Sequence, residues 1–256
     1  MTDQRDDAFS LRGRHALVVG GTRGIGRAIA WRLAAAGAHV WANYVRDQVH
    51  ADRLQEEATS AGLGVEIVRA DVTSPKGLDG LIATVSSPAP VSILVFAAAT
   101  GVHKHLDQLT TRHFDWVFAL NVRAFFELVQ RLSPSMPSGS SILAVSSEGA
   151  SHAVPHYALV GASKGALESL ARHAAAELAP KGIRVNILSP GAVMTDAWNV
   201  LPDSEARLAD AARRSMLGRL TTFDEVAWAA QFLCSDAGSG LVGHTLVVDG
   251  GARIRG

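Results

Sequence analysis

Short apolar runs alternate with longer amphipathic stretches from residue 15 to the end of the chain. Most of the runs are continuously apolar, which is typical of parallel strands buried on both faces. The alternation predicts repeated β-α units, and therefore an α/β fold with one parallel sheet of about seven strands and helices on both faces. The predicted strands are His15–Gly20, Ala38–Asn43, Val65–Ala70, Ile93–Ala98, Ser141–Ser146, Arg184–Leu188 and Thr245–Val248, and the predicted helices are Ile25–Ala36, Arg46–Ala61, Arg112–Leu132, Gly161–Leu178 and Asp224–Cys234.

No linker, charge block or fixed-period repeat interrupts this pattern. We therefore expect a single domain over residues 11–256, preceded by a flexible polar tail at residues 1–10. The segment from about 196 to 219 fits no strand and carries Pro202 and Gly218 near its ends. Because ligands bind beyond the carboxyl ends of parallel strands, this segment is interpreted either as a mobile lid or as a plain surface helix.

Composition removes several classes of function. Lys plus Arg and Asp plus Glu both number 24, and a net charge of zero argues against nucleic acid or an acidic membrane as a partner. The one cysteine, Cys234, excludes an intrachain disulfide and a multi-cysteine metal cluster, and suits the cytoplasm. No apolar run approaches the roughly 18 residues that cross a bilayer. The ten histidines show no ligand spacing with acids, so we expect no metal.

A glycine-rich turn follows the first predicted strand and opens the first predicted helix. Gly20, Gly24 and Gly26 give the spacing G-x-x-x-G-x-G, which matches the dinucleotide fingerprint only in part. Glycines permit a tight turn and let the backbone approach a pyrophosphate at a helix N-terminus. The alternative is an ordinary tight connection. The candidate cradle comprises Gly20, Thr22, Arg23, Gly24, Ile25 and Gly26.

The end of the second predicted strand bears on the choice of cofactor. Tyr44 stands where NAD sites usually place an acid on the adenosine ribose. Arg23 and Arg46 are candidates to bracket a 2′-phosphate, which favours NADPH over NADH; alternatively, Arg46 is only a solvated helix-start residue. After the third strand, Asp71 and Val72 are candidates for the adenine site, although Asp71 is also suited to capping a turn.

Further ordered motifs extend this pattern over nearly the whole chain. They are Asn121, Ser146-Ser147, Ser163-Lys164, Pro190-Gly191 with Thr195, and Val248-Asp249-Gly250-Gly251. With the glycine turn and Asp71-Val72, they resemble the short-chain dehydrogenase/reductase family over residues ~11–251. The resemblance implies a Rossmann-type, doubly wound single domain and an NAD(P)-dependent oxidoreductase. It also implies cofactor contacts from Ala98, Lys164, Pro190, Gly191, Val193 and Thr195.

The catalytic motif departs from the usual family pattern. The tyrosine of Tyr-x-x-x-Lys would stand at 160, where this chain has Val160, but Tyr157 lies seven residues before Lys164. Seven helical steps rotate about 700°, so Tyr157 would lie on the same helix face as Lys164 if the helix reaches it. It would then lie roughly 4.5 Å closer to the helix N-terminus than a tyrosine at position 160. Tyr-x6-Lys and the surrounding stretch YALVGASKGALESL resemble the enoyl-acyl-carrier-protein reductase III branch.

This second resemblance implies reduction of a 2-enoyl thioester. A hydride would add to Cβ, and Tyr157 would donate to the enolate oxygen. Lys164 would hold the nicotinamide ribose and lower the pKa of the tyrosine through its charge. Ser147 would add a second hydrogen bond, and Asn121 would fix a water relay near Lys164. Three alternatives remain: a carbonyl or imine reductase, a silent nucleotide-binding protein, and a tyrosine that merely packs.

The resemblance also implies partners. The last predicted helix and Leu241–Gly251 resemble the family's self-association surface, so we expect a homotetramer. The substrate would be an acyl thioester, either linked to coenzyme A or bound to a carrier protein. Candidate residues for its acyl pocket are Trp198, Val200, Leu201 and Met216.

Overall fold

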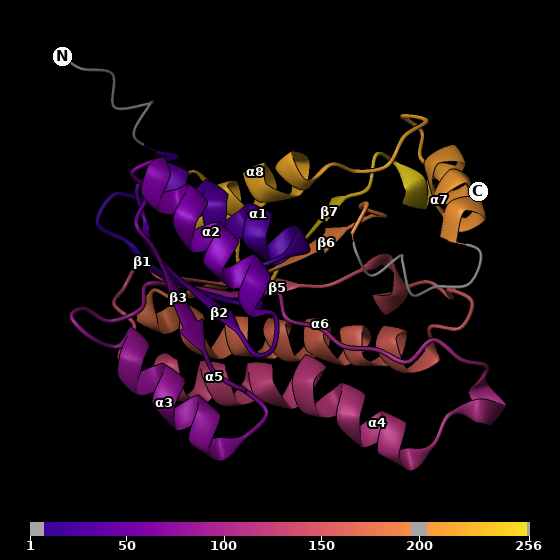
Figure 1. The fold of residues 1–256 in the computed structure, drawn as a ribbon, viewed down its shortest axis with the longest axis horizontal. Helices are drawn as coiled ribbons and strands as arrows, with labels where there is room; N and C mark the ends of the chain where they lie inside the picture. Colours follow the sequence, from indigo (N-terminus) through magenta and orange to yellow (C-terminus); the bar gives the residue numbers. More distant parts are fainter. Residues whose placement is uncertain (1–7, 196–203, 255–256) are drawn as a thin grey trace.

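The computed structural model describes residues 8–195 and 204–254, in which seven parallel strands form one sheet (Figure 1). The strand order is β3-β2-β1-β4-β5-β6-β7, so the order reverses between β1 and β4. This is the doubly wound, Rossmann-type arrangement predicted from the alternating pattern. The strands are β1 (His15–Val19), β2 (His39–Tyr44), β3 (Val65–Arg69), β4 (Ile93–Phe96), β5 (Ser141–Val145), β6 (Arg184–Pro190) and β7 (Thr245–Val248).

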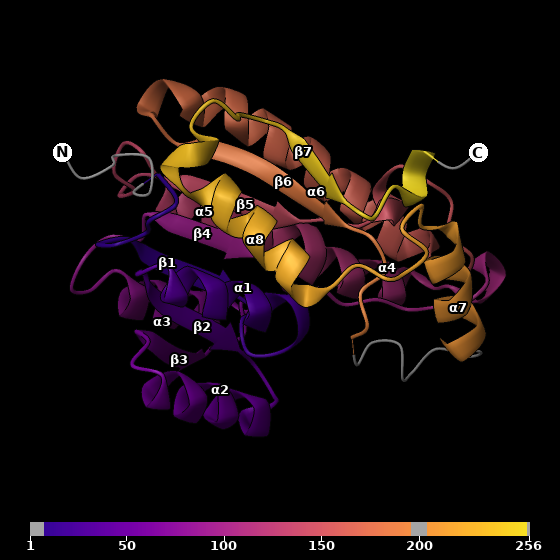
Figure 2. The ribbon, with the colours of Figure 1, turned by 90° about the horizontal axis from the view of Figure 1, so that it is seen from above.

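Helices cover both faces of the sheet (Figures 1 and 2). On one face lie α1 (Gly24–Ala35), α2 (Gln48–Ser60) and α8 (Phe223–Cys234). The other face carries α3 (Pro75–Val85), α4 (Thr111–Phe118), α5 (Ala124–Leu132) and α6 (Ala158–Leu178). The remaining helix, α7 (Ser204–Arg214), lies outside these two layers, beyond β6 and β7.

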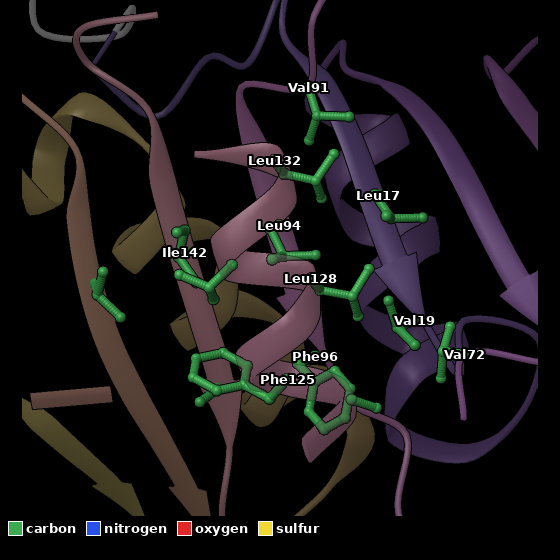
Figure 3. Packing of buried hydrophobic residues seen from close by; sticks show 14 of the residues in the cluster. Leu17, Val19, Val72, Val91, Leu94, Phe96, Phe125, Leu128, Leu132 and Ile142 are labelled. Atoms are coloured by element: carbon green, nitrogen blue, oxygen red, sulfur yellow. The ribbon is translucent and has the colours of Figure 1, made fainter. Parts of the chain in front are cut away.

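The apolar strands build two cores, one on each side of the sheet. Figure 3 shows the α5 side, where Phe125, Leu128 and Leu132 pack on side chains of β1, β4 and β5. The strand residues alternate between the two cores: Leu17 faces α5 while Val18 faces α1 and α8. Burial on both faces explains why the strands are continuously apolar.

The structure differs from the predicted elements in three places. Helix α3 was not predicted. The predicted helix Arg112–Leu132 is divided into α4 and α5 by a π-helical turn at Ala119–Arg123. Of the predicted tail, residues 8–10 are held in place, because the carbonyl oxygen of Ala8 accepts from Ala237 N at 3.0 Å and Phe9 packs on Phe232.

The predicted lid region lies partly outside the described residues. Residues 204–214 form α7, so a helix occupies much of this segment. Trp198, Val200 and Leu201 of the predicted acyl pocket fall in the range 196–203 and outside the description. No helix in the described part of the chain is long and apolar enough to cross a membrane.

Candidate active site

The glycine turn between β1 and α1 forms a cradle with no room for side chains. Gly20 has a φ of +76°, and a Cβ there would lie 2.8 Å from the Cα of Ala98. A Cβ on Gly26 would overlap the carbonyl oxygen of Gly20. The N-terminus of α1 has no side-chain cap and no acid in its first turn, so its amide groups and positive dipole end face outward. These features fit a dinucleotide pyrophosphate.

A cleft of about 610 Å³ opens in front of this cradle. It lies at the carboxyl ends of β1, β2, β3 and β4, where the strand order reverses and ligands bind in such sheets. Most of the predicted cofactor residues line it together: Gly20, Thr22, Arg23, Gly24, Ile25, Gly26, Tyr44, Arg46, Asp71, Val72, Ala98 and Thr195.

Two arginines and one acid lie in the cleft at the end of β2. Arg23 and Arg46 are exposed, and both line the cleft. Tyr44 is buried and donates its hydroxyl hydrogen to Oε1 of Gln48. Asp47 caps the N-terminus of α2, and hydrogen bonds from His50 hold the pKa of its carboxyl below the usual value, with Arg23 contributing.

Asp71 has both positions that the sequence suggested, since it caps a turn and also lines the cleft. Its Oδ1 accepts from the backbone N of Thr73 at 2.9 Å and from the Thr73 hydroxyl at 2.6 Å, so it caps the turn after β3. It also lines the cleft beside Val72. Turn capping therefore fixes this carboxylate at the cleft wall.

Sequence reasoning missed several cleft residues. The most prominent is Trp116 of α4, which is 49% exposed and lines the same cleft as the glycine turn. Its place depends on how α4 approaches the sheet, and the unexpected π-helical turn helps to set that approach. The other missed lining residues are Asn43, Val45, Asp47, Thr73, Ala97, Ala99, Thr100, Ala119 and Leu120.

Tyr157 stands at the start of α6 and not inside it. The helix begins at Ala158, and Tyr157 is its N-cap with φ −117° and ψ 12°. The helix therefore does not reach Tyr157, and Tyr157 and Lys164 do not share one helix face in the way that the Tyr-x6-Lys spacing predicts. The ring rests on Gly149, since a Cβ there would lie 2.6 Å from Cδ1 and Cε1 of the ring. The hydroxyl lies 3.4 Å from Oγ of Ser147, so the structure brings these two predicted residues together.

The environment of Tyr157 raises its pKa. Burial is the main cause, the carboxylate of Glu148 adds to it, and the hydrogen bond to Ser147 opposes it. The prediction that Lys164 lowers this pKa is wrong for the structure described. The ammonium group of Lys164 instead donates to the carbonyl oxygen of Val145 at 2.7 Å. Tyr157 therefore stays protonated and acts as a hydrogen-bond donor.

Lys164 is buried, and its neighbour Ser163 connects it to Asn121. Burial lowers the pKa of Lys164 to about 8, against an opposing effect of Glu168. The amide nitrogen of Asn121 donates to Ser163 Oγ and to Thr100 O, both at 2.9 Å, and its Oδ1 accepts from Thr100 N at 2.8 Å. The Asn121 side chain thus fastens the loop after β4 to α6.

We expect the buried lysine to make stability depend on pH. Between pH 8 and 10.5 the unfolded chain still binds the proton that folded Lys164 has lost, so this group makes the free energy of unfolding rise with pH. The shift corresponds to about 3 kcal/mol. Denaturant unfolding at pH 7.5 and pH 10 gives the change in the free energy of unfolding for wild type and for Lys164→Met. The change should be larger in the wild type, and an equal change in both proteins would contradict the prediction.

Val160 stands at the position of the usual family tyrosine, where its side chain makes only apolar contacts. It is 4% exposed, and a Cβ on Gly101 would overlap its Cγ2. The loop after β4 therefore closes directly over this position. Within the described part of the site, Tyr157 is the tyrosine that remains to donate a proton or a hydrogen bond.

The segment after β6 forms the other wall. Gly191 donates its N–H to Val248 O at 2.9 Å, and a Cβ there would lie 2.8 Å from Asp249. Val193 is buried, whereas Thr195 reaches the cleft opposite Gly24. Pro190 ends β6. Of the four residues predicted here, only Thr195 lines the described cleft. Pro190, Gly191 and Val193 do not line it but position the segment.

Helix α7 is joined by an ion pair to the loop after β5. The guanidinium of Arg214 lies 3.5 Å from the carboxylate of Glu148, the residue after Ser147. Met216, predicted for the acyl pocket, is 60% exposed. Among residues 8–195 and 204–254, no three His, Cys, Asp or Glu side chains are placed to hold a metal ion.

Comparison with known proteins shows the family of this chain. The family model described as Enoyl-(Acyl carrier protein) reductase matches residues 19–253. A short-chain dehydrogenase from Burkholderia cenocepacia, solved in complex with NADP, superposes with a TM-score of 0.88 at 31% identity, covering 95% of this chain and 99% of that one. The chain belongs to the short-chain dehydrogenase/reductase family.

Two curated relatives show which reactions are named for proteins similar to this chain. The 1-cyclohexenylcarbonyl-CoA reductase of Streptomyces collinus is 34% identical over 242 residues, covering 93% of this chain and 86% of its own. A tropinone reductase homologue of Arabidopsis thaliana is 33% identical over 251 residues, covering 97% and 93%. This short-chain dehydrogenase/reductase is accordingly an oxidoreductase.

Proposed function

We propose that the protein is an NADPH-dependent reductase of the carbon–carbon double bond in a 2-enoyl thioester, linked to coenzyme A or to a carrier protein. The observation that carries the proposal is the pair formed by Tyr157 and Ser147, whose hydroxyl oxygens are 3.4 Å apart, with Val160 in the usual tyrosine position. This places a single phenol outside the position used for reducing carbonyl groups.

The raised pKa of Tyr157 suits this chemistry. When bound, the nicotinamide supplies the hydride that adds to Cβ of the substrate. Negative charge then develops on the thioester oxygen, and the enolate needs a donor but not full proton transfer to that oxygen. The protonated Tyr157 donates this hydrogen bond, and Ser147 orients the phenol. A proton from water then adds to Cα and completes the reduction.

The family comparison supports the same reaction class. The matching family model bears the name of an enoyl reductase, and the Streptomyces relative is named as the reductase of an unsaturated acyl-CoA. Tropinone reductase homologues among the relatives make a carbonyl substrate the second candidate. That candidate requires Tyr157 to transfer its proton to the substrate oxygen, whereas the enoyl reaction needs only a hydrogen bond there.

The decisive test compares two substrates. NADPH oxidation is followed with a crotonyl thioester and with the matching 3-oxobutyryl thioester, both carried on N-acetylcysteamine. We expect turnover of the crotonyl thioester and little of the 3-oxo thioester. Turnover of the 3-oxo thioester alone would replace the proposal by carbonyl reduction. Turnover of neither, with NADPH still bound, would favour another electrophile or a silent binding protein.

For the cofactor we propose NADPH over NADH, because Arg23 and Arg46 flank the cleft beyond β2. Loss of one charge-assisted contact costs about 1.5–3 kcal/mol, so we expect Arg46→Ala to raise Kd for NADPH at least tenfold. Its Kd for NADH should stay unchanged. Fluorescence titration measures both constants, with Arg53→Ala as the control because Arg53 pairs with Glu57 on α2. An equal loss for both cofactors would contradict this assignment.

We also propose a cytoplasmic homotetramer that binds neither nucleic acid nor membrane. Three observations favour self-association: β7 is an edge strand, Trp228 of α8 is 55% exposed, and Val242 is 46% exposed. Light scattering at micromolar concentration should give four times the mass of 26.9 kDa. A monomeric mass would overturn the proposal.

A further inference from the structure

Imidazole rings from two loops lie near the proposed catalytic tyrosine, and one of them is in contact with its ring. The ring of His103, in the loop after β4, lies 5.5 Å from that of Tyr157, centroid to centroid, at an angle of 37°. Two residues farther along, His105 meets His156 edge to face at 4.2 Å. His156 has a φ of +61° and directly precedes Tyr157. We call His103, His105 and His156 the histidine wall.

Helix α7 carries a positive charge, that of Arg207, within electrostatic reach of His103. Arg207 is half-buried, and its charge acts on His103. Burial is the first cause of the lowered pKa of His103, and Arg207 and His156 add to it. The imidazole of His103 is therefore neutral near pH 7, where it donates one N–H, while Arg207 supplies the charge.

Arg207 differs from its neighbours on α7. Arg213 and Arg214 pair with Asp210, and Arg214 also faces Glu148. In contrast, Arg207 forms no ion pair with an acid in the described part of the chain. A half-buried guanidinium without an acidic partner favours binding an anion.

These groups are unsuited to a purely hydrocarbon acyl chain. An alkyl group packed against His103 and Arg207 would cover N–H donors without replacing their bonds to water, which is unfavourable. A carboxylate would accept from both groups. Because His103 lies in ring contact with Tyr157, such a carboxylate must be close in the substrate to the thioester carbonyl that Tyr157 contacts.

We propose that the enoyl thioester carries a carboxylate on its acyl chain, one methylene beyond the double bond, and that His103 and Arg207 bind it. This inference rests on the proposed function, since it takes the thioester carbonyl to lie at Tyr157. It makes His103 and Arg207 specificity-determining residues, and the substrate a dicarboxylic 2-enoyl monothioester.

The test uses two substrates of matched shape. Glutaconyl thioester carries the carboxylate, and 5-methyl-2-hexenoyl thioester replaces it with an isopropyl group; both are carried on N-acetylcysteamine, with crotonyl thioester as the reference. We expect kcat/KM for the glutaconyl thioester to exceed that for the branched alkyl thioester at least tenfold. His103→Phe and Arg207→Leu should each reduce this ratio at least tenfold, mainly through KM.

His173→Phe is the matched control, because His173 is exposed on α6 and away from Tyr157. It should keep the wild-type ratio. Preference for the alkyl thioester, or an unchanged ratio in both variants, would overturn the inference while leaving enoyl reduction intact. Failure to reduce even the crotonyl thioester would instead reject the proposed function.

Discussion

Tyr157→Phe is expected to lower kcat for a 2-enoyl thioester by a factor of roughly 10² to 10³, because it removes the donor to the enolate oxygen; such a loss corresponds to about 3–4 kcal/mol of barrier. Cofactor binding should be retained, since Tyr157 does not line the described cleft. Steady-state kinetics and fluorescence titration of NADPH measure the two quantities separately.

Ser147→Ala provides the comparison for this prediction. Ser147 contacts the phenol at 3.4 Å and orients it, so its loss should cost less than the loss of the phenol itself. We expect a tenfold decrease or less in kcat, roughly the contribution of one neutral hydrogen bond. If Tyr157→Phe kept wild-type kcat, or if Ser147→Ala were the more damaging variant, the phenol would not be the group that meets the enolate.

The second large effect is expected at the glycine turn. A methyl group on Gly26 would overlap the carbonyl oxygen of Gly20, which belongs to the backbone and cannot rotate away as a side chain would. We expect Gly26→Ala to lose measurable NADPH binding and to lower the free energy of unfolding by about 1–3 kcal/mol, as overpacking does. Denaturant unfolding and NADPH titration followed by tryptophan fluorescence measure these effects, because Trp116 lines the same cleft.

Gly80→Ala is the matched control. A Cβ on Gly80 meets nothing within 4 Å, and the residue lies inside α3. The same substitution there should stabilise the protein by roughly 0.5–1 kcal/mol, because alanine favours the helix. A Gly26→Ala protein that binds NADPH normally would show that the backbone at the turn does not need to approach the cofactor closely.

The sheet was predictable because most strands are apolar on both faces. All seven strands were found from this pattern, with ends that differ by a few residues at most. Helix α3 was missed because Pro75, Gly77 and Gly80 weaken its helical signal. The π-helical turn was also missed: it adds one residue within a continuous amphipathic stretch, and the sequence carries no separate mark of it.

The candidate site was predictable in part of its residues, but not in its electrostatics. The cofactor positions follow from motif spacing, and most of them do line one cleft. The pKa of Tyr157 depends on burial and on its separation from Lys164, and neither is encoded locally. Similarly, His103 lies more than fifty residues before Tyr157 in the chain, so their contact appears only once β4 and α6 are placed.

The contact between Val160 and Gly101 has a consequence for how such proteins diverge. The backbone of the loop after β4 closely contacts the side chain at position 160, so a tyrosine restored there by one substitution would meet this backbone before its hydroxyl reached the substrate. Return to the usual family chemistry therefore requires the loop to change as well. The packing therefore couples position 160 to the backbone at Gly101, so that the side chain and the loop can change only together.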